Sequence, residues 1–380
     1  MPVIAISGSY GGLNLGDEAI LTCMLQELRA GVPGAEIVVF SRDAAHTTRH
    51  HRAERVVPVR ELTREQVTPH IPRLDLLLLG GGGILYDREA RVYLREVQIA
   101  QELGVRTATY AVSAGPLETG EARQAVAETL NKMDAVTVRE ARAKRLLEEI
   151  GVTRDIVVTA DPAVLLTPEP FTEGMLEREG VRKRRHLVGM SVREVGPAAP
   201  KLGEIAYHQL LATAADFVVD RLDADVLFVP LERGDIRESH AVIGRMAAAE
   251  RASVLRGTST LRQLLGLMEH LDAMVAMRLH CLIFAAIARI PFIALPYADK
   301  VGGFLEEVGL PARTLDETHP GPLLASIDRS WDERARLKAA LDERLPALQQ
   351  RARETTRIVL DLVRRPAPAR GEPAPAAEAG

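Results

Sequence analysis

Aromatic side chains are scarce in this chain of 380 residues, of which Phe, Trp and Tyr together make up only 4%. Few platforms therefore exist on which nucleic-acid bases could stack. The formal net charge is −4, so the chain lacks an overall positive field that would attract nucleic acid or an anionic membrane. Both features argue against a nucleic-acid-binding protein.

Cysteines and long apolar runs are also rare. Cys23 and Cys281 each lie in an apolar segment that is expected to be helical, as is typical of small buried side chains in a reducing compartment. The most apolar run is interrupted by Arg289 and Pro291, which leaves it too short to span a bilayer. The N-terminus lacks the basic region of a signal peptide. We therefore expect a cytoplasmic protein without a transmembrane segment.

What the chain does contain is an alternation of short apolar runs and amphipathic segments. Its content of 47% hydrophobic and 26% charged residues is ordinary for a globular protein. With 380 residues, the chain is longer than a domain built around a single hydrophobic core usually is. Strands are expected at residues 3–7, 37–40, 74–79 and 107–112, and the rhythm restarts at residue 187. This pattern predicts an α/β fold, with two facing Rossmann-like domains, parallel sheets and a ligand-binding cleft between the domains.

The expected domain boundaries follow from breaks in this rhythm. Residues 1–170 would form the N-terminal Rossmann-like domain and residues 185–330 the C-terminal one, joined by a stretch that contains prolines and a basic turn. Residues 331–364 are strongly helical and could pack back on the N-terminal domain. Residues 365–380 have low complexity and are expected to be disordered.

A buried strand, an apolar helix and a second buried strand are expected between residues 273 and 304. Arg278 and His280 fall where the first strand gives way to the helix, and Lys300 follows the second strand. Ligands of open α/β sheets bind beyond the carboxyl ends of strands, where two cations and an imidazole would suit an anionic substrate and proton transfer. Alternatively, His280 is hydrogen-bonded scaffold and Arg278 only pairs with a carboxylate.

Two glycine-rich segments follow strands in the first half of the chain. Residues 8–18 include Gly11, Asn14 and Asp17 ahead of a predicted helix, and residues 80–83 are four consecutive glycines. Neither segment has the spacing of a dinucleotide-binding motif or of a P-loop. Each could line a site, the four glycines as an anion-binding nest of backbone N–H groups, or form only a turn or a flexible junction.

Arg139 follows another expected strand, at residues 135–138, and so lies at the same topological level as the glycine-rich segments. Its guanidinium could face a ligand, or it could form a salt bridge with Glu140. The histidines within residues 46–51 have no carboxylate or thiolate partner at a useful spacing, so we expect a solvated loop there and not a metal site.

Short motifs follow one another in order along most of the chain, at residues 11–21, 79–85, 113–116, 137–140, 160–162, 189–193, 277–280 and 297–301. This ordered set resembles the polysaccharide pyruvyl transferase family. One departure is that Ser113 and Ala114 stand where a Gly-Ile pair is associated with the family, which puts the ligand contacts of that loop in question. The resemblance implies a GT-B-like pair of Rossmann domains.

Members of this family transfer a pyruvyl group from phosphoenolpyruvate onto two hydroxyls of a sugar, which forms a ketal and releases phosphate. The resemblance implies an enzyme whose catalytic residues are His280, Arg278 and Arg139. No cofactor is expected, since phosphoenolpyruvate is a substrate. The resemblance gives no reason to add a metal to the site, and a metal requirement stays open. The residues expected to bind substrate are Lys300, Leu279, Gly11, Asn14, Asp17, Gly81, Gly82 and Arg193.

The expected acceptor is a sugar in a cell-surface or cell-wall polysaccharide or its precursor, which could be lipid-linked, and peripheral contact with a membrane stays open. Arg forks and a Lys charge suit the phosphate and carboxylate of phosphoenolpyruvate, and His suits proton transfer near neutrality. One alternative is a GT-B glycosyltransferase with a nucleotide-sugar donor, in which Glu232 or Glu238 would bind the ribose. Another is a non-catalytic carbohydrate- or anion-binding module.

Overall fold

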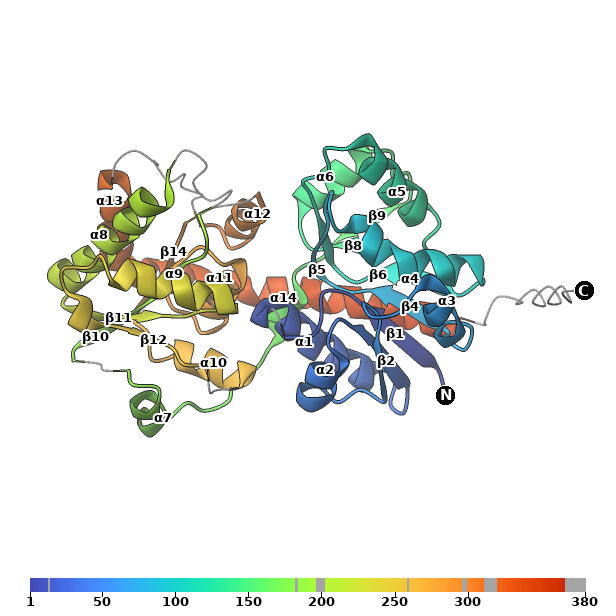
Figure 1. Cartoon of the computed structure of the whole chain (residues 1–380), viewed down its shortest axis with the longest axis horizontal. Coiled ribbons are helices and arrows are strands. Elements are labelled where there is room, and N and C mark those ends of the chain that lie inside the picture. The colour runs from blue at the N-terminus through green and yellow to red at the C-terminus, as the bar shows by residue number, and fades with distance from the viewer. Residues whose placement is uncertain are drawn as a thin grey trace, which may run out of the picture. The chain divides into compact units, whose positions relative to one another are not determined.

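The computed structural model describes residues 1–12, 14–181, 184–195, 202–257, 260–295, 299–310 and 320–365, except for the side chains of residues 299 and 300. The chain divides into two compact units, whose elements are labelled in Figure 1. Unit 1 comprises Met1–Gly12, Met24–Thr159 and Arg353–Gly380, and unit 2 comprises Leu13–Cys23 and Ala160–Ala352. The tail predicted to be disordered, residues 366–380, lies outside the described residues.

Unit 1 contains a five-stranded parallel sheet in the order β3-β2-β1-β4-β6. All four leucines of β4 are buried, as expected for a central parallel strand covered on both faces. This order, in which the second and third strands lie on one side of the first and the later strands on the other, is that of a Rossmann fold. The strands are β1 (Val3–Ser7), β2 (Glu36–Ser41), β3 (Arg55–Pro58), β4 (Leu76–Leu79) and β6 (Arg106–Thr109).

A second parallel sheet of unit 1 has the order β5-β7-β8-β9. It corrects two expectations from the sequence. Residues 107–112 do not form one strand, because the chain turns at Ala111, whose φ is 50°, and passes from β6 into β7. Gly82 and Gly83 belong to a strand and pair with Val112 and Ser113. The strands are β5 (Gly82–Leu85), β7 (Val112–Ala114), β8 (Val136–Val138) and β9 (Ile156–Val158).

Amphipathic helices cover the sheets of unit 1, and their apolar faces enter a core of buried aliphatic side chains. Helix α4, for example, buries Tyr93, Leu94 and Val97 in that core. The helices are α2 (Ala44–His50), α3 (Arg64–Val67), α4 (Ala90–Glu102), α5 (Gly120–Asn131) and α6 (Ala141–Glu149), together with the part of α1 (Leu15–Gly31) from Met24 onward.

Unit 2 repeats the same strand permutation in a sheet of order β12-β11-β10-β13-β14, again parallel throughout. The four residues of β13 are buried, so this strand too lies in the centre of the core. The strands are β10 (His186–Ser191), β11 (Ala224–Phe228), β12 (Ala252–Val254), β13 (Ala273–Ala276) and β14 (Phe292–Ala294).

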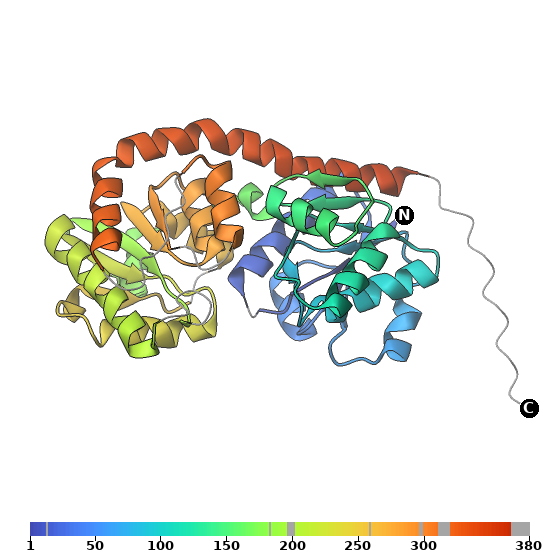
Figure 2. The same cartoon turned by 90° about the horizontal axis from the view of Figure 1, so that it is seen from above.

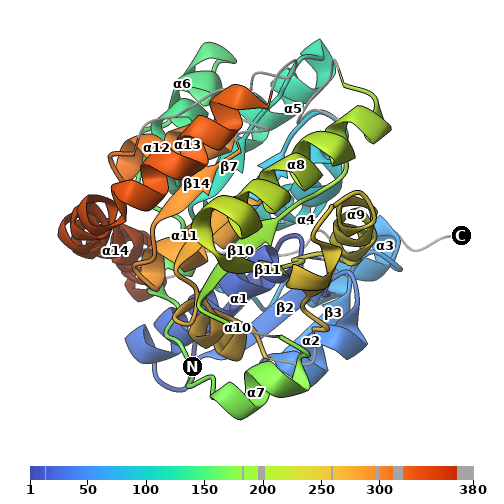
Figure 3. The ribbon, with the colours of Figure 1, turned by 90° about the vertical axis from the view of Figure 1, so that its left-hand side faces the viewer.

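The helices of unit 2 connect these strands. Figure 3 looks onto unit 2 with α8 and α9, which contact each other, near the viewer. The stretch predicted as a linker contains the short helix α7, and its basic residues 182 and 183 lie outside the described residues. The helices are α7 (Glu173–Arg178), α8 (Glu204–Leu222), α9 (Arg233–Ile243), α10 (Leu261–Met268), α11 (Leu279–Ile287), α12 (Asp299–Glu307) and α13 (Gly321–Asp332).

The long helix α14 (Arg334–Arg364) contributes residues to both units and is the red ribbon that ends the described chain in Figure 2. Its residues from Arg353 onward belong to unit 1. There Arg106 donates a hydrogen bond of 2.9 Å to the carbonyl oxygen of Leu362, and the hydroxyls of Tyr110 and Thr356 lie 2.6 Å apart. Of the helices in the described ranges, none has the length and hydropathy needed to cross a membrane.

Candidate functional site

The strand order of unit 2 reverses between the neighbouring strands β10 and β13. Beyond the carboxyl end of such a pair, open α/β sheets bind their ligands. Arg278 lies there as the N-cap of α11, with extended φ and ψ of −70° and 123°, and His280 follows in the first turn. The structure thus places the Arg278–His280 motif at the position that the sequence predicted for it.

Arg278 is held by two carboxylates. Its Nε and Nη2 atoms donate to Asp235 over 3.1 and 2.5 Å, and its Nη1 and Nη2 atoms donate to Glu232 over 3.0 and 2.7 Å. The Arg278 and Asp235 side chains are 7% and 0% exposed, so the bonds between these two residues are buried, bidentate and charge-assisted. The Glu232 side chain is 31% exposed. Pairing with carboxylates, the alternative raised by the sequence, is therefore present, and a catalytic role for Arg278 stays a prediction.

Asp235 depends on this guanidinium. Burial raises the pKa of Asp235 above its ordinary value, and the hydrogen bonds and positive charge of Arg278 oppose that shift. The Asp235 carboxylate also accepts hydrogen bonds from the backbone N–H groups of Leu231 and Glu232, at 3.0 and 3.2 Å. Asp235 therefore ties the start of α9 to Arg278.

Asn14, which the sequence predicts to bind substrate, belongs to the same network. Its Nδ2 atom donates to Glu232 over 2.5 Å, and its Oδ1 atom accepts from the N–H of Gly16 over 2.7 Å. The N–H of Leu15 also donates to the carbonyl oxygen of Leu231 over 3.0 Å. The segment that begins α1 is thus fastened to the loop before α9, and Glu232 bridges Asn14 and Arg278.

His280 lies close to a carboxylate that the predicted set of site residues does not include. Its Nε2 atom is 3.6 Å from Oδ2 of Asp161, which is too long for a hydrogen bond. That Nε2 atom is buried and has no hydrogen-bond partner among the described residues. Asp161 is itself fixed, because its Oδ1 atom accepts the N–H of Ala163 at 2.9 Å. A buried imidazole nitrogen is therefore left beside an anchored carboxylate.

Gly16 lies next to the imidazole of His280, on its Nδ1 side. A Cβ atom built on Gly16 would lie only 1.9 Å from Nδ1 of His280, so the backbone at the start of α1 packs directly on the ring. Only glycine allows so close an approach. Gly16 and Asp161 both stand in motifs that resemble the family, and that position in a motif is the sequence signal that could have identified them.

Arg193 follows the end of β10, on the other side of the strand reversal. Its guanidinium pairs with Glu194, and although burial works in the opposite direction, this bond lowers the pKa of the Glu194 carboxyl. Tyr207 of α8 donates a hydrogen bond of 2.9 Å to the backbone oxygen of Arg193. Arg193 is therefore positioned beside the same sheet edge as Arg278.

The other predicted residues of unit 2 are distributed as follows. Leu279 is buried in the first turn of α11, and Asp17 is half-buried in the first turn of α1. Lys300 lies in α12, but its side chain is outside the described residues.

Cys281 is buried and forms no disulfide, and burial raises the pKa of its thiol to about 12. This thiol is protonated near neutrality, which disfavours it as a nucleophile.

The predicted glycines of unit 1 lie in the segments that follow strands β1 and β4. Gly11 has a φ of 125°, and a Cβ there would lie 2.6 Å from the backbone N of Asp43, so this turn requires glycine. Gly81 is buried between β4 and β5, and Gly82 begins β5. With Gly82 and Gly83 in a strand, the expected nest is not formed at these two residues, and their part in substrate binding stays a prediction.

Arg139 is 3% exposed and pairs with Glu140 at 3.0 Å, as the alternative interpretation anticipated. Glu140 also accepts a hydrogen bond from the hydroxyl of Ser113, one of the residues that depart from the family motif. The Arg139 guanidinium is therefore anchored within unit 1 at the end of β8.

The family of the chain follows from a comparison with models of known protein families. The model of a family described as polysaccharide pyruvyl transferase matches residues 14–299. The chain belongs to this family. Membership places the protein among transferases of polysaccharide biosynthesis and implies a sugar or polysaccharide acceptor. No curated protein sequence matches the chain.

Solved structures resemble the chain in fold. The UDP-GlcNAc 2-epimerase of Neisseria meningitidis, bound to UDP-GlcNAc, gives a TM-score of 0.62 at 8% identity over 95% of this chain and 100% of that chain. The UDP-GlcNAc 2-epimerase of Methanocaldococcus jannaschii gives 0.60 at 12% identity over 86% and 92%. A mutant O-GlcNAc transferase of Thermobaculum terrenum gives 0.56 at 13% identity over 96% and 68%. At such identities the likeness establishes the fold alone, which is GT-B-like as predicted.

Proposed function

We propose that the protein transfers the pyruvyl group of phosphoenolpyruvate onto two hydroxyls of a sugar in a cell-surface polysaccharide or its precursor. The observation that carries this proposal is the buried Nε2 atom of His280, which has no hydrogen-bond partner among the described residues and lies 3.6 Å from Asp161. Such a group can move protons inside a site that excludes water. The reducing environment suggested by two cysteines without a disulfide supports a cytoplasmic location.

His280 would act first as a general acid. Its proton passes to the methylene carbon of phosphoenolpyruvate, and C2 becomes electrophilic. A sugar hydroxyl forms a bond to C2, and its proton returns to the imidazole. The C2–O bond to phosphate then breaks, and the second hydroxyl bonds to C2 and closes the ketal. Of the two hydroxyl protons, one balances the new methyl group and the other leaves with inorganic phosphate.

Asp161 would be a positioning residue in this mechanism. Its carboxylate, which is anchored by the N–H of Ala163 and lies 3.6 Å from Nε2 of His280, would orient the imidazole for proton transfer. Gly16 would keep the ring in place, since its backbone packs on the Nδ1 side of His280. Replacement of Asp161 by Asn should lower kcat and alter the pH profile of kcat, whereas a residue that only supports the fold would change the stability and not that profile.

The donor anion would be bound mainly by groups other than Arg278. Two carboxylates already balance the charge of Arg278, which suits a guanidinium that shapes the turn before α11. The N–H groups of Leu279 and His280 open that helix, and such a helix start favours phosphate or carboxylate groups. Within unit 2, Arg193 would supply further positive charge, and the roles of Lys300 and Arg139 stay predictions from the family resemblance.

The nucleotide-sugar alternative is less well supported. Glu232, one candidate ribose ligand, is engaged by Arg278 and Asn14. Glu238, the other, is buried against His208 at 2.8 Å. Both carboxylates therefore have partners, and nothing in the described residues favours nucleotide binding over a small anionic donor.

The test is to incubate the purified protein with phosphoenolpyruvate and a panel of free and lipid-linked saccharides, and to measure phosphate. We expect release of one phosphate per ketal formed, and loss of turnover in the His280→Gln variant with donor binding retained. Nucleotide release from UDP-sugars without phosphate release from phosphoenolpyruvate would contradict the proposal.

A further inference from the structure

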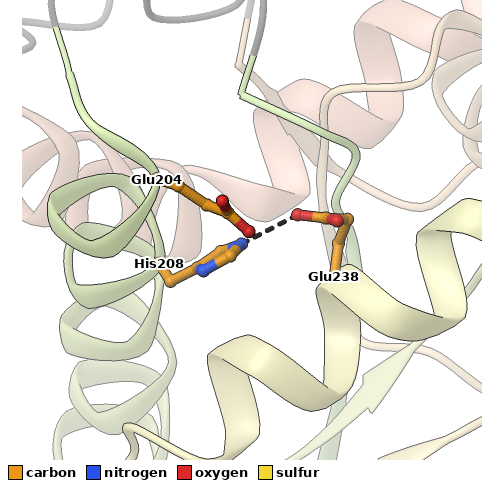
Figure 4. A group of neighbouring side chains, drawn as sticks. All are labelled: Glu204, His208 and Glu238. Carbon is orange, nitrogen blue, oxygen red and sulfur yellow. Dashed lines mark hydrogen bonds and ion pairs between the residues drawn. The ribbon is translucent and has the colours of Figure 1, made fainter.

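Three side chains that the proposed reaction does not use converge between α8 and α9. Figure 4 shows Glu204 and His208 projecting from α8 towards Glu238 of α9. One potential ligand atom from each lies within 4.8 Å of the other two. The Nε2 atom of His208 is 2.8 Å from Oε2 of Glu238, and both residues are 2% exposed, whereas Glu204 is exposed. The cluster thus has two buried members, His208 and Glu238, and one member at the surface, Glu204.

The local sequence explains why these groups meet. Glu204 and His208 are four residues apart in α8, so they project from one face of the helix. Glu238 is three residues after Asp235 in α9, and both acids are buried on the inward face of that helix. While Asp235 binds Arg278, Glu238 is directed to α8.

The charges around the cluster leave one carboxylate oxygen facing the imidazole. Arg237, which is 79% exposed, binds Oε1 of Glu238 through Nε and Nη2 at 3.1 and 2.9 Å. The other oxygen, Oε2, lies toward His208. The charges of Arg193 and Glu194 act on the pKa of Tyr207, which is next to His208 in α8. The charges of Glu194 and Glu204 act on the pKa of Arg237. A buried carboxylate requires compensation by hydrogen bonds or by a cation.

We propose that Glu204, His208 and Glu238 form a binding site for a divalent transition-metal ion such as Zn²⁺. An imidazole nitrogen with two carboxylates is a donor set that suits Zn²⁺, with a fourth position left for water. The imidazole disfavours Mg²⁺ and Ca²⁺, which prefer oxygen ligands only. The negative charges of Glu204 and Glu238, the latter shared with Arg237, favour a cation at this position.

The ion would join α8 to α9 and so support the helix that carries Asp235. The site is separate from the proposed proton transfer at His280, since none of its three ligands belongs to that mechanism. In the competing explanation, His208 is only a hydrogen-bond partner of Glu238 and no metal binds. The two explanations differ in what happens when metal is supplied.

The experiment uses the full chain, freed of metal by a chelator and then titrated with Zn²⁺ by calorimetry. We expect one ion per chain in the parent protein and an affinity at least about tenfold weaker in the Glu204→Gln variant. Glu204 is exposed, so this variant should fold. The matched control is Asp220→Asn, which removes an exposed acid from the same helix, and its affinity should stay within about twofold of the parent value.

His208→Gln adds a second comparison, with His240→Gln as its control because His240 is an exposed histidine of α9. Bound Co²⁺ should give the absorption spectrum of a low-coordinate site in the parent protein and in the His240 variant, but not in the His208 variant. Absence of stoichiometric Zn²⁺ binding, or equal affinity in the parent and in Glu204→Gln, would overturn the proposal. Neither readout depends on pyruvyl transfer.

Discussion

The two units have the same order of strands in their five-stranded sheets but different chemistry where the strand order reverses. In unit 1, glycines follow the central strands β1 and β4. In unit 2, the corresponding ends of β10 and β13 lead to Arg193, Arg278 and His280. The topology supplies a ligand-binding edge in both cases, and the residues that follow the strands decide what that edge can do. We infer that unit 2 carries the proton transfer.

This comparison is tested most severely at His280. In His280→Gln, kcat should fall by about 10²–10⁴-fold, because the general acid and base is lost. Calorimetry with phosphoenolpyruvate should still detect binding. The control is His240→Gln, an exposed histidine of the same unit, which should retain the parent kcat. Normal turnover in the His280 variant would show that His280 of unit 2 does not carry the proton transfer.

The Arg278 network should have the largest effect on stability. Arg278→Ala leaves the buried Asp235 without its principal cation, so unfolding in urea should require about 3–5 kcal/mol less free energy. Glu232→Gln should cost less, since the Glu232 side chain is 31% exposed. A loss below about 1 kcal/mol for Arg278→Ala would be that of an exposed pair and would contradict the geometry described for this network.

Gly16 sharpens the comparison by testing the position of the imidazole. A methyl group at Gly16 must displace His280, so Gly16→Ala should lower kcat by about 10²-fold, as a misplacement of roughly 1 Å does, with little change in KM for the donor. Gly120→Ala is the control, because a Cβ there meets nothing within 4 Å. Equal kcat values in the two variants would show that the ring tolerates movement.

Arg139 tests what unit 1 contributes. Arg139→Lys keeps the positive charge but loses the planar fork, so KM for phosphoenolpyruvate should rise by about tenfold, with a smaller change in kcat. Steady-state kinetics at several donor concentrations separate the two constants. If KM is unchanged, Arg139 only supports Glu140 and the end of β8.

The smallest effect is expected at Cys281. Because burial raises the pKa of its thiol to about 12, the native protein should react negligibly at this residue with a thiol reagent at pH 8, and Cys281→Ser should remain active. In denaturant both cysteines should react. Rapid modification of Cys281 with loss of turnover would contradict the assignment of the chemistry to its neighbour His280.

The sequence predicted the positions of strand ends better than it predicted the contacts made there. Arg278 could be placed after a buried strand because apolar runs mark parallel strands. Its partners Glu232 and Asp235 are 46 and 43 residues earlier, and no local pattern connects them. The position of Asp161 beside His280 likewise depends on long-range packing.

The conformational preferences of single residues did not predict the backbone structure at two places in unit 1. Gly82 and Gly83 form a strand even though glycine has little preference for strands, because pairing with Val112 and Ser113 outweighs that preference. The turn at Ala111, with φ of 50°, was also not predictable, since few alanines adopt that conformation. The division of the predicted strand at 107–112 follows from this turn.

Glycan analysis tests the central claim most directly. A strain that lacks the protein would be complemented with the parent gene or with the His280→Gln variant, and its surface glycans examined by NMR for the methyl signal of a pyruvate ketal. We predict that the signal is lost in the deletion strain, returns with the parent protein and does not return with His280→Gln. A ketal signal that persists in the deletion strain, or that the His280 variant restores, would contradict the account.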